Sequence, residues 1–375
     1  MKYPLAMRLW ILAASTLVAC ATPSSTATGP SAPQLEELVA HDTQLTGVAV
    51  SNASGRVFIN FPRWVDAPKP SVAEVWADKR VLPFPNEEWN AWDGTPQTAG
   101  DHFVCVQAVF VDAKDQLWIV DPASPGFAGV VPGGAKVVQV DLATGKVVRV
   151  YKLDAAAAPA KSYLNDIRID AARKRAYLTD SGLGALVVID LDSGVARRRL
   201  EATAAVKADA SLAVTVQGQR WLGEDGKTPQ IHSDGIALDA EAKFLYFHAL
   251  TGKTLYRVPA ASLADDALAD DALAALVESV GASGPADGLG EDALGNIFIT
   301  DLEHDAVRMR RPDGTVSVVL QDARLSWPDS VAFDATGRLY VTASQVQKLP
   351  AFNAGVDKRD RPFRLFRTVG PIVPR

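Results

Sequence analysis

One short pattern recurs six times along the chain, and it limits the possible folds more than any other feature of the sequence. Each copy is an alternating six-residue segment that closes on serine or aspartate and is followed by a segment of aliphatic and aromatic residues. Such alternation predicts pairs of short β-strands. The first segments are TGVAVS (46–51), QAVFVD (107–112), NDIRID (165–170), DGIALD (234–239), DGLGED (287–292) and DSVAFD (329–334).

The stretch from Tyr163 to Arg199 contains one complete copy of the repeated unit. Its four expected strands lie near 167–170, 176–180, 185–190 and 195–200. A single four-stranded sheet cannot bury both of its faces, so each copy must pack against neighbours. Four-stranded sheets repeated around an axis form a β-propeller, and six copies predict an all-β, six-bladed ring.

The last copy predicts how the ring closes. After its second strand only residues 363–369 remain for a third strand, and the early segment Leu35–His41 is available as the fourth. An N-terminal strand that pairs into the last blade would remove the exposed edges of an open ring. In the fourth copy, the leucines and paired acids of LADDALADDALAAL (263–276) predict a short helical insertion.

The N-terminal residues have the pattern of an export signal. An apolar run from Leu9 to Ala19 is too short for a membrane span, and LVAC, ending at Cys20, resembles a bacterial lipobox. On this interpretation residues 1–19 are a lipoprotein-type signal peptide, Cys20 carries lipid and residues 20–34 form a disordered tether. The protein would then lie at the periplasmic face of the cell envelope, on the outer membrane. The alternatives are an ordinary signal peptide cut nearby and a misassigned start site.

Composition supports one globular domain over residues 35–375. The chain is 48% hydrophobic, and its formal net charge of −6, without a basic cluster, argues against nucleic acid as a partner. We expect a monomer whose partners are a small molecule and, through the lipid, a membrane. With Cys20 committed to lipid, Cys105 has no cysteine to pair with, and we expect it to be buried as a small hydrophobe.

Longer segments resemble a known family over roughly residues 45–370. They include VQAVFVDAKDQLWIVD (106–121), YLTDSGLGALVVIDL (177–191) and ADGLGEDALGNIFITDLEHDAV (286–307). The chain resembles the yellow and major royal jelly protein family, in a bacterial, dopachrome-tautomerase-related branch. The resemblance implies a six-bladed propeller. It implies no single activity, because the family includes pigmentation proteins, nutritional proteins and binders of small amines. Insect members are typically disulfide-bonded, which this chain cannot be.

Polar residues at the start of each innermost strand are expected to meet at one end of the central tunnel. Converging carboxylates would raise each other's pKa, and a hard cation or a ligand amine would relieve the repulsion. Asp-Gly and Asn-Asp before a strand are also ordinary turn chemistry. The candidate ligand-binding residues are Gln107, Asn165, Asp166, Asp234, Asp287 and Asp329, with Thr46 at the same place in the first copy.

A second set of polar residues follows the second strands, outside the first. We interpret these mainly as turn and interblade hydrogen-bonding residues: Asp121, Asp180 and Asp301, with His248 and His304 nearby. Three tryptophans could cover the pocket, although core or loop packing is the commoner role of this residue. They are Trp64, Trp89 and Trp92.

Two functions are compatible with this pattern. The first is an exported, lipid-anchored protein that binds a small polar or cationic molecule in its axial pocket. The alternative is a Ca²⁺-dependent lactonase or esterase, similar to gluconolactonase and regucalcin, with Asn165, Asp234 and Asp287 as candidate metal ligands. Those enzymes typically take a glutamate from the first blade, where this chain has Thr46. Tautomerase activity is suggested only by the naming of the family.

Overall fold

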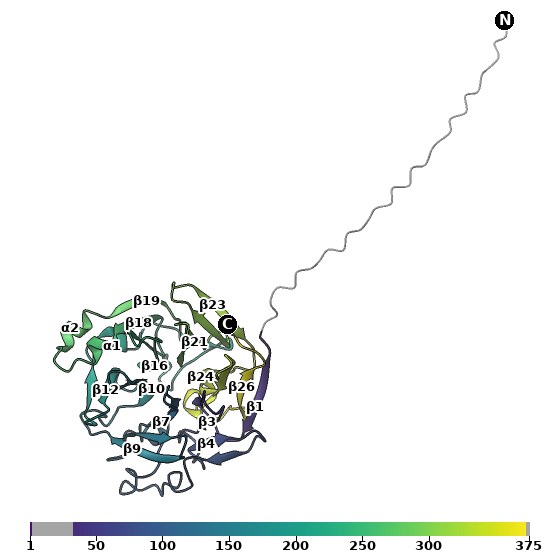
Figure 1. Cartoon of the computed structure of the whole chain (residues 1–375). Helices are drawn as coiled ribbons and strands as arrows, with labels where there is room; N and C mark the ends of the chain where they lie inside the picture. Colours follow the sequence, from purple (N-terminus) through teal and green to yellow (C-terminus); the bar gives the residue numbers. More distant parts are fainter. Residues whose placement is uncertain (2–32, 373–375) are drawn as a thin grey trace. The chain divides into compact units, whose positions relative to one another are not determined.

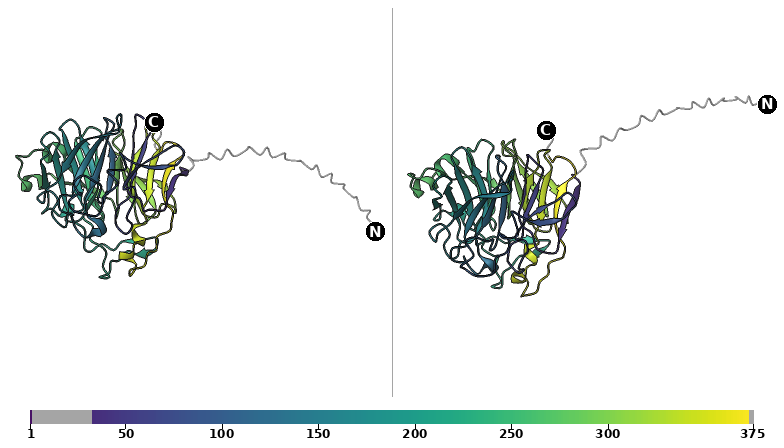
Figure 2. Two further views of the ribbon diagram at one scale, coloured as in Figure 1. Left: turned by 90° about the horizontal axis from the view of Figure 1, so that it is seen from below. Right: turned by 60° about the horizontal axis from the view of Figure 1, so that its bottom comes forward.

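The computed structural model describes Met1 and residues 33–372. Within residues 33–372, six four-stranded sheets follow one another around a central axis, and the predicted six-bladed β-propeller is confirmed (Figure 1). In side view the strands of neighbouring sheets stand next to one another, and long loops project from one side of the ring (Figure 2). No helix among the described residues is long and apolar enough to cross a bilayer.

Each of the first five blades uses four consecutive strands. Blade 1 consists of β2 (Val48–Val50), β3 (Val57–Asn60), β4 (Val72–Val75) and β5 (Val81–Pro83). Blade 2 consists of β6 (Ala108–Val111), β7 (Gln116–Asp121), β8 (Lys136–Asp141) and β9 (Lys146–Lys152). Blade 3 consists of β10 (Leu164–Asp170), β11 (Arg175–Asp180), β12 (Ala185–Asp190) and β13 (Ala196–Arg199). Blade 4 consists of β16 (Ser233–Leu238), β17 (Phe244–Ala249), β18 (Thr254–Pro259) and β19 (Glu278–Ala282). Blade 5 consists of β20 (Leu289–Glu291), β21 (Ile297–Asp301), β22 (Ala306–Arg310) and β23 (Val316–Gln321).

The sixth blade joins the two ends of the domain. Its strands are β24 (Pro328–Phe333), β25 (Leu339–Ala343) and β26 (Phe363–Thr368), and its outer strand is β1 (Leu35–His41). Strand β1 pairs antiparallel with β26, from Leu35 opposite Thr368 to His41 opposite Phe363. The predicted closure by an N-terminal strand is therefore confirmed, and β26 has no open edge.

Several segments depart from the four-strand repeat. The predicted insertion in blade 4 is helical, as two short helices, α1 (Ala260–Leu263) and α2 (Asp270–Ala274). Between blades 3 and 4 lies a small hairpin of β14 (Thr215–Val216) and β15 (Gln219–Arg220), which the repeats do not predict. Four 3₁₀ turns complete the described structure: η1 (Pro125–Phe127), η2 (Ala204–Val206), η3 (Val346–Lys348) and η4 (Pro350–Phe352).

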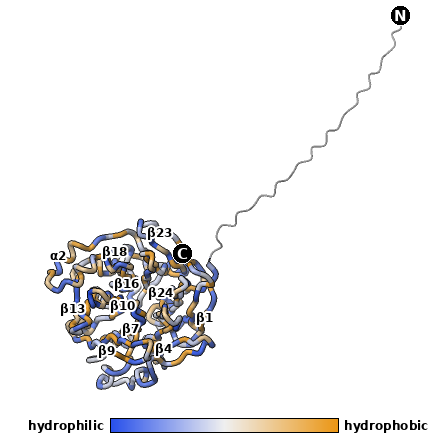
Figure 3. The backbone as a smooth tube through the Cα atoms, in the orientation of Figure 1, coloured by the Kyte–Doolittle hydropathy of each residue, from blue (hydrophilic) through white to orange (hydrophobic). Residues whose placement is uncertain are grey.

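Most of the core consists of apolar clusters, one between each pair of neighbouring blades, and two smaller clusters lie among the loops. Between blades 2 and 3, for example, buried Trp118 and Val137 pack with Ile167 and Leu178. Equivalent clusters occupy the other five blade interfaces. The hydropathy of the backbone trace shows hydrophobic segments within the sheets and hydrophilic ones at many turns (Figure 3). Cys105 is buried, as expected, and forms no disulfide within residues 33–372.

We call the polar residues at the start of the innermost strands, Thr46 and the six candidate ligand-binding residues, the hub residues. The innermost strands deviate from regular pairing at several of these positions. The register with the second strand shifts between Leu164 and Ile167, between Ser233 and Ile236, and between Pro328 and Val331. Bulges of this kind bend a strand and redirect its side chains. They release residues 165–166, 234–235 and 329–330 from the regular alternation at the hub.

Close contact between inner strands explains two of the Asp-Gly pairs. A Cβ atom at Gly235 would lie 2.6 Å from the carbonyl oxygen of Asp287, and one at Gly288 would lie 2.3 Å from that of Asp329. Neither position can hold a side chain without moving backbone, so glycine follows the hub aspartate in blades 4 and 5. The close approach of the inner strands therefore explains why Asp234 and Asp287 lie in Asp-Gly pairs and also why they lie at the hub.

Candidate functional site

A cavity of about 750 Å³ opens where the innermost strands begin, and we call it the axial pocket. Four of the predicted hub residues line it, and each is more than nine-tenths buried: Gln107, Asn165, Asp234 and Asp287. They come from blades 2, 3, 4 and 5, so radial repetition does bring these side chains together. We refer to Asp234 and Asp287 as the floor pair. That these residues bind a ligand stays a prediction.

Two aromatic clusters form walls of the axial pocket. On one side Phe127 lies between Trp64 and Tyr163, with ring centroids 5.2 and 5.4 Å away. On the other side Trp221 packs edge-on against Trp327 and Phe352, at 4.9 and 5.0 Å. Rigid aromatic walls with a polar end are typical of sites that hold small organic molecules.

A chain of hydrogen bonds runs from the first wall to the amide side chains of Gln107 and Asn165. Trp64 Nε1 donates to the Tyr163 hydroxyl at 2.5 Å, and that hydroxyl donates to Gln107 Oε1 at 2.9 Å. Gln107 Nε2 donates to Asn165 Oδ1, and Asn165 Nδ2 donates to Ser181 Oγ, each at 3.4 Å. This chain fixes the orientation of both amides. Burial raises the pKa of Tyr163 well above its usual value, so its hydroxyl stays protonated.

The floor pair is different, because it lacks a matching cation. Burial is the main reason that the pKa of Asp234 is raised well above its usual value, and the neighbouring charge of Asp287 adds to it. Burial also raises the pKa of Asp287, to about 6, against the opposing effect of Trp327, whose Nε1 donates to Asp287 Oδ2 at 2.5 Å. Among the fully buried polar atoms of the described lining residues, Asp234 Oδ1 and Trp221 Nε1 have no hydrogen-bond partner. The pocket therefore retains an unmatched acceptor and an unmatched donor.

The remaining predicted hub residues lie outside the axial pocket. Burial raises the pKa of Asp329 well above its usual value, and the neighbouring charge of Asp287 adds to this effect. Its Oδ1 accepts a hydrogen bond from Ser330 Oγ. Thr46 is fully buried and donates to the carbonyl oxygen of Gln107, so its hydroxyl supports the backbone of the next blade. Asp166 faces away from the axial pocket, into a second cavity.

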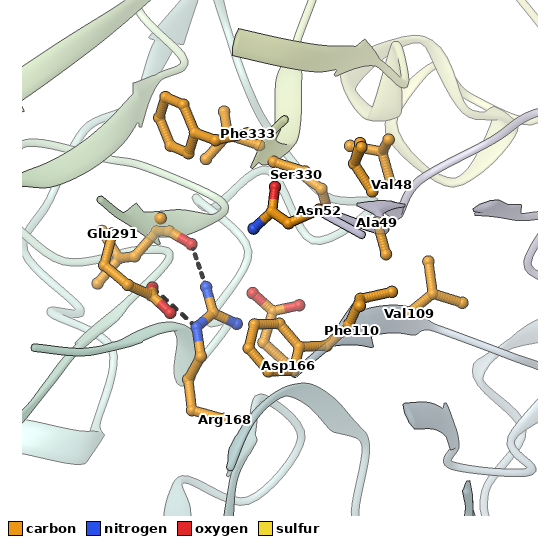
Figure 4. Close-up of a pocket in the computed structure, with 16 residues that line it drawn as sticks. Val48, Ala49, Asn52, Val109, Phe110, Asp166, Arg168, Glu291, Ser330 and Phe333 are labelled. Carbon is orange, nitrogen blue, oxygen red and sulfur yellow. Dashed lines mark hydrogen bonds and ion pairs between the residues drawn. The ribbon is translucent and has the colours of Figure 1, made fainter. Parts of the chain in front are cut away.

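That second, lower cavity measures about 180 Å³ and lies between the innermost strands (Figure 4). Arg168 crosses it, donating from Nε to Glu291 at 2.9 Å and from Nη2 to the carbonyl oxygen of Leu289 at 2.7 Å. Its guanidinium also lies over Phe110, 4.8 Å from the ring centroid. Burial raises the pKa of Asp166 to about 7, although Arg168 acts in the opposite direction. Arg168 thus links blades 3 and 5 below the floor of the axial pocket.

The second set of aspartates accepts hydrogen bonds from backbone amides and pairs with buried or half-buried cations. Asp121 pairs with fully buried Lys136 at 2.7 Å, Asp180 with Arg198 at 2.7 Å, and Asp301 with Arg308 at 3.0 Å. Of the histidines, His304 is exposed and His248 is buried, with its pKa lowered to about 4 by burial. These geometries agree with the turn and interblade role expected from the sequence.

The predicted metal ligands do not form a complete calcium site as arranged. Asn165 Oδ1 and Asp287 Oδ2 already accept hydrogen bonds, from Gln107 and Trp327. Calcium takes six to eight oxygen ligands, and within residues 33–372 no group of three or more His, Cys, Asp or Glu side chains is placed to hold a metal ion. At the first-blade position where a glutamate would supply a charged ligand, this chain has Thr46, and the Thr46 hydroxyl donates to the carbonyl oxygen of Gln107.

Comparison with known families identifies the relationship. The family model described as "Major royal jelly protein" matches residues 104–369, more than half of the chain. The chain belongs to the major royal jelly protein family. A comparison with curated proteins gives no match. The predicted family membership is therefore confirmed, and it fixes the fold more firmly than any activity.

Several solved structures share the fold at low identity. A gluconolactonase from Xanthomonas campestris aligns with TM-score 0.53 and 15% identity over 89% of each chain. Regucalcin, a calcium-binding protein from Agrobacterium tumefaciens, aligns with TM-score 0.51 and 16% identity over 88% of this chain and 90% of its own. A luciferin-regenerating enzyme aligns with TM-score 0.53 and 11% identity over 90% and 95%. At such identities the likeness concerns the fold alone.

Most of the aromatic lining was not predicted from the sequence. Of the three tryptophans considered, only Trp64 lines the axial pocket; Trp89 packs on Phe103, and Trp92 donates to a loop carbonyl. Tyr163 and Trp327 lie two residues before the hub positions Asn165 and Asp329, a spacing that could have identified them. Residues such as Trp221 and Phe352 come from loops without periodicity, and the sequence holds no comparable signal for them.

Proposed function

We propose that the protein binds a small organic molecule with an aromatic or apolar body and one cationic amino group in its axial pocket. The floor pair, two buried carboxyls without a lysine or arginine partner, is the observation that best supports this function. An ammonium group at the floor would supply the missing positive charge and hydrogen-bond donors. The aromatic walls would enclose the rest of the molecule and stabilise it by apolar burial and cation–π attraction.

A matched pair of ligands tests this proposal. Phenethylamine and phenethyl alcohol have nearly the same shape, but only the amine is charged near neutral pH. In binding calorimetry we expect the amine to bind at least about tenfold more tightly, because a desolvated cation–carboxylate contact contributes roughly 1.5–3 kcal/mol. Equal affinities would contradict a cation-selecting floor. Absence of binding across a wider panel of amines would contradict the proposed function.

The alternative is a Ca²⁺-dependent lactonase or esterase of gluconolactonase-like type. The unmatched acceptor Asp234 Oδ1 is the one feature of the site that favours it. If it is right, EDTA abolishes hydrolysis of a lactone panel, added Ca²⁺ restores it, and Asp234→Asn has the effect of EDTA. Unchanged hydrolysis in EDTA, or no hydrolysis with Ca²⁺ present, would rule out this alternative.

We further propose that the protein is exported and anchored by lipid on Cys20, a residue that lies outside the described part of the chain. The lipobox-like LVAC sequence supports this location. Cells supplied with labelled palmitate should label the wild-type protein, and Cys20→Ala should lose all label and leave the membrane fraction. Label retained by Cys20→Ala, or a wild-type protein that stays unlabelled, would contradict the anchor.

A further inference from the structure

The aromatic walls and the floor pair follow one order around the ring. Each innermost strand contacts the next, from β2 through β6, β10, β16, β20 and β24 back to β2, so blades 3 and 6 are opposite each other (Figure 1). Tyr163 and Trp327 lie two residues before the first hub residue of blades 3 and 6. Asp234 and Asp287 belong to blades 4 and 5, between them. Half of the ring therefore carries, in sequence, an aromatic residue, two carboxyls and a second aromatic residue.

Each wall presents an accessible ring to the axial pocket. Phe127 of the first wall is half exposed, and its ring stacks on Trp64 with 5.2 Å between centroids. Phe352 of the second wall is partly exposed and packs edge-on against nearly buried Trp221. The less accessible rings hold the accessible ones in place, so each wall can receive one flat apolar group. The cavity volume, about 750 Å³, is in the range of pockets that enclose drug-sized molecules.

The two carboxyls of the floor pair are placed to share one nitrogen. The Asp234 and Asp287 side chains lie within hydrogen-bonding reach of each other. Asp287 Oδ2 accepts from Trp327, whereas Asp234 Oδ1 has no partner. An ammonium nitrogen between them can donate to both. A secondary ammonium group has two N–H groups, one for each carboxyl, and two carbon arms that leave the nitrogen in different directions. The floor therefore fits a nitrogen whose arms lead to the two walls.

We propose that the axial pocket contains two aromatic subsites, one on each wall, and that it prefers a secondary amine with an aromatic group on each side of the nitrogen. This inference rests on the proposed function and narrows its ligand class. The nitrogen donates one N–H to Asp234 and one to Asp287, while one ring packs on Phe127 and the other on Phe352. A ligand with a single ring leaves one wall in contact with water.

Two secondary amines test for the second subsite. Bis(2-phenylethyl)amine has a ring on each arm, whereas N-methylphenethylamine has the same ammonium group and one ring. In calorimetry we expect the two-ring amine to bind at least about tenfold more tightly, because its second ring also leaves water. Equal affinities would overturn this inference while leaving the proposed function intact. Binding of neither amine would contradict the proposed function, and the inference with it.

Two wall variants distinguish separate subsites from a single slot. Phe127→Ala and Phe352→Ala each remove the accessible ring of one wall, and each should weaken binding of the two-ring amine about tenfold. The ring of N-methylphenethylamine can occupy only one wall at a time, so at most one variant should weaken its binding as much. If both variants weaken binding of both amines equally, one ring touches both walls, and the two-subsite inference is wrong.

Trp76→Ala is the control for unspecific adsorption of an apolar amine. Trp76 is an exposed aromatic residue at the turn between β4 and β5, and it does not line the axial pocket. Its substitution should leave the affinities for both amines unchanged. A loss of two-ring affinity as large as in Phe127→Ala would show that the second ring binds outside the pocket, and would overturn the inference.

A crystal structure of the wild-type protein tests the same point without any substitution. With bromine on both rings of the two-ring amine, we expect two anomalous peaks in the axial pocket, one beside Phe127 and one beside Phe352. Two peaks on the same wall, or a second ring in solvent, would overturn the inference.

Discussion

Asp287→Asn is expected to weaken amine binding at least about thirtyfold while making the empty propeller at least as stable as wild type at about pH 8. Removing one member of a buried charge pair weakens binding by about 2–5 kcal/mol, at least a thirtyfold loss of affinity. The asparagine can still accept the Trp327 hydrogen bond, so the pocket wall keeps its support. Calorimetry with phenethylamine measures the first effect, and chemical denaturation measures the second.

The stability gain depends on pH in a defined direction. The pKa of Asp287 rises from 3.8 to about 6 on folding, so the unfolded chain releases its proton first as the pH rises. The free energy of unfolding therefore falls between about pH 4 and pH 6, by an amount on the order of 3 kcal/mol from this group, and does not recover at higher pH. Asp287→Asn removes this loss. The difference in free energy of unfolding between variant and wild type should therefore be smaller at about pH 4 than at pH 8.

Asp301→Asn is the matched control for this prediction. Asp301 is also a buried aspartate of blade 5, but it pairs with Arg308 at 3.0 Å instead of facing the pocket. Its substitution should lower the free energy of unfolding, because half-buried Arg308 loses its partner, and leave amine affinity unchanged. If Asp301→Asn weakens binding as strongly as Asp287→Asn, the floor pair has no special role in recognition.

Removal of the closing strand β1 should have the largest effect on stability. Leu35 and Val39 are buried in the clusters on the two sides of blade 6, and Glu36 and Glu37 pair with Arg367 and Arg364 of β26. Loss of two buried aliphatic side chains costs roughly 3–6 kcal/mol before the β-ladder is counted, a large part of typical domain stability. The exposed edge of β26 should also promote association.

Two truncations make this prediction specific. A chain that starts at residue 33 keeps β1 and should unfold like the full-length protein, whereas a chain that starts at residue 42 should unfold at much lower denaturant concentration. A peptide covering residues 33–43, added in trans, should restore part of the lost stability. Equal unfolding midpoints for the two truncations would contradict closure of the ring by the N-terminal strand.

The sequence predicts the ring well because each blade is encoded locally. Alternation in segments such as NDIRID specifies a strand regardless of distant contacts, and the missing fourth strand of the last blade leaves Leu35–His41 as its complement. The meeting of Asn165, Asp234 and Asp287 follows from the same repetition. These predictions need the symmetry of the fold and no further detail of side-chain packing.

Other features of the site depend on contacts that no local pattern encodes. Asp329 is equivalent to Asp287 in the repeat but does not line the axial pocket, and Asp166, one residue after Asn165, lines the lower cavity instead. Repulsion between carboxylates suggested raised pKa values, but burial is the larger cause for Asp234 and Asp287. Trp221 reaches the pocket from an irregular loop, and its position depends on packing against Trp327.

A crystal structure with para-bromophenethylamine tests the central claim most directly. The bromine gives an anomalous signal that locates the ligand without relying on its full density. We predict a peak between the two aromatic walls, with the amino group within hydrogen-bonding distance of Asp234 and Asp287. A peak in the lower cavity or on the outer surface, or an empty axial pocket at saturating ligand, would contradict the account.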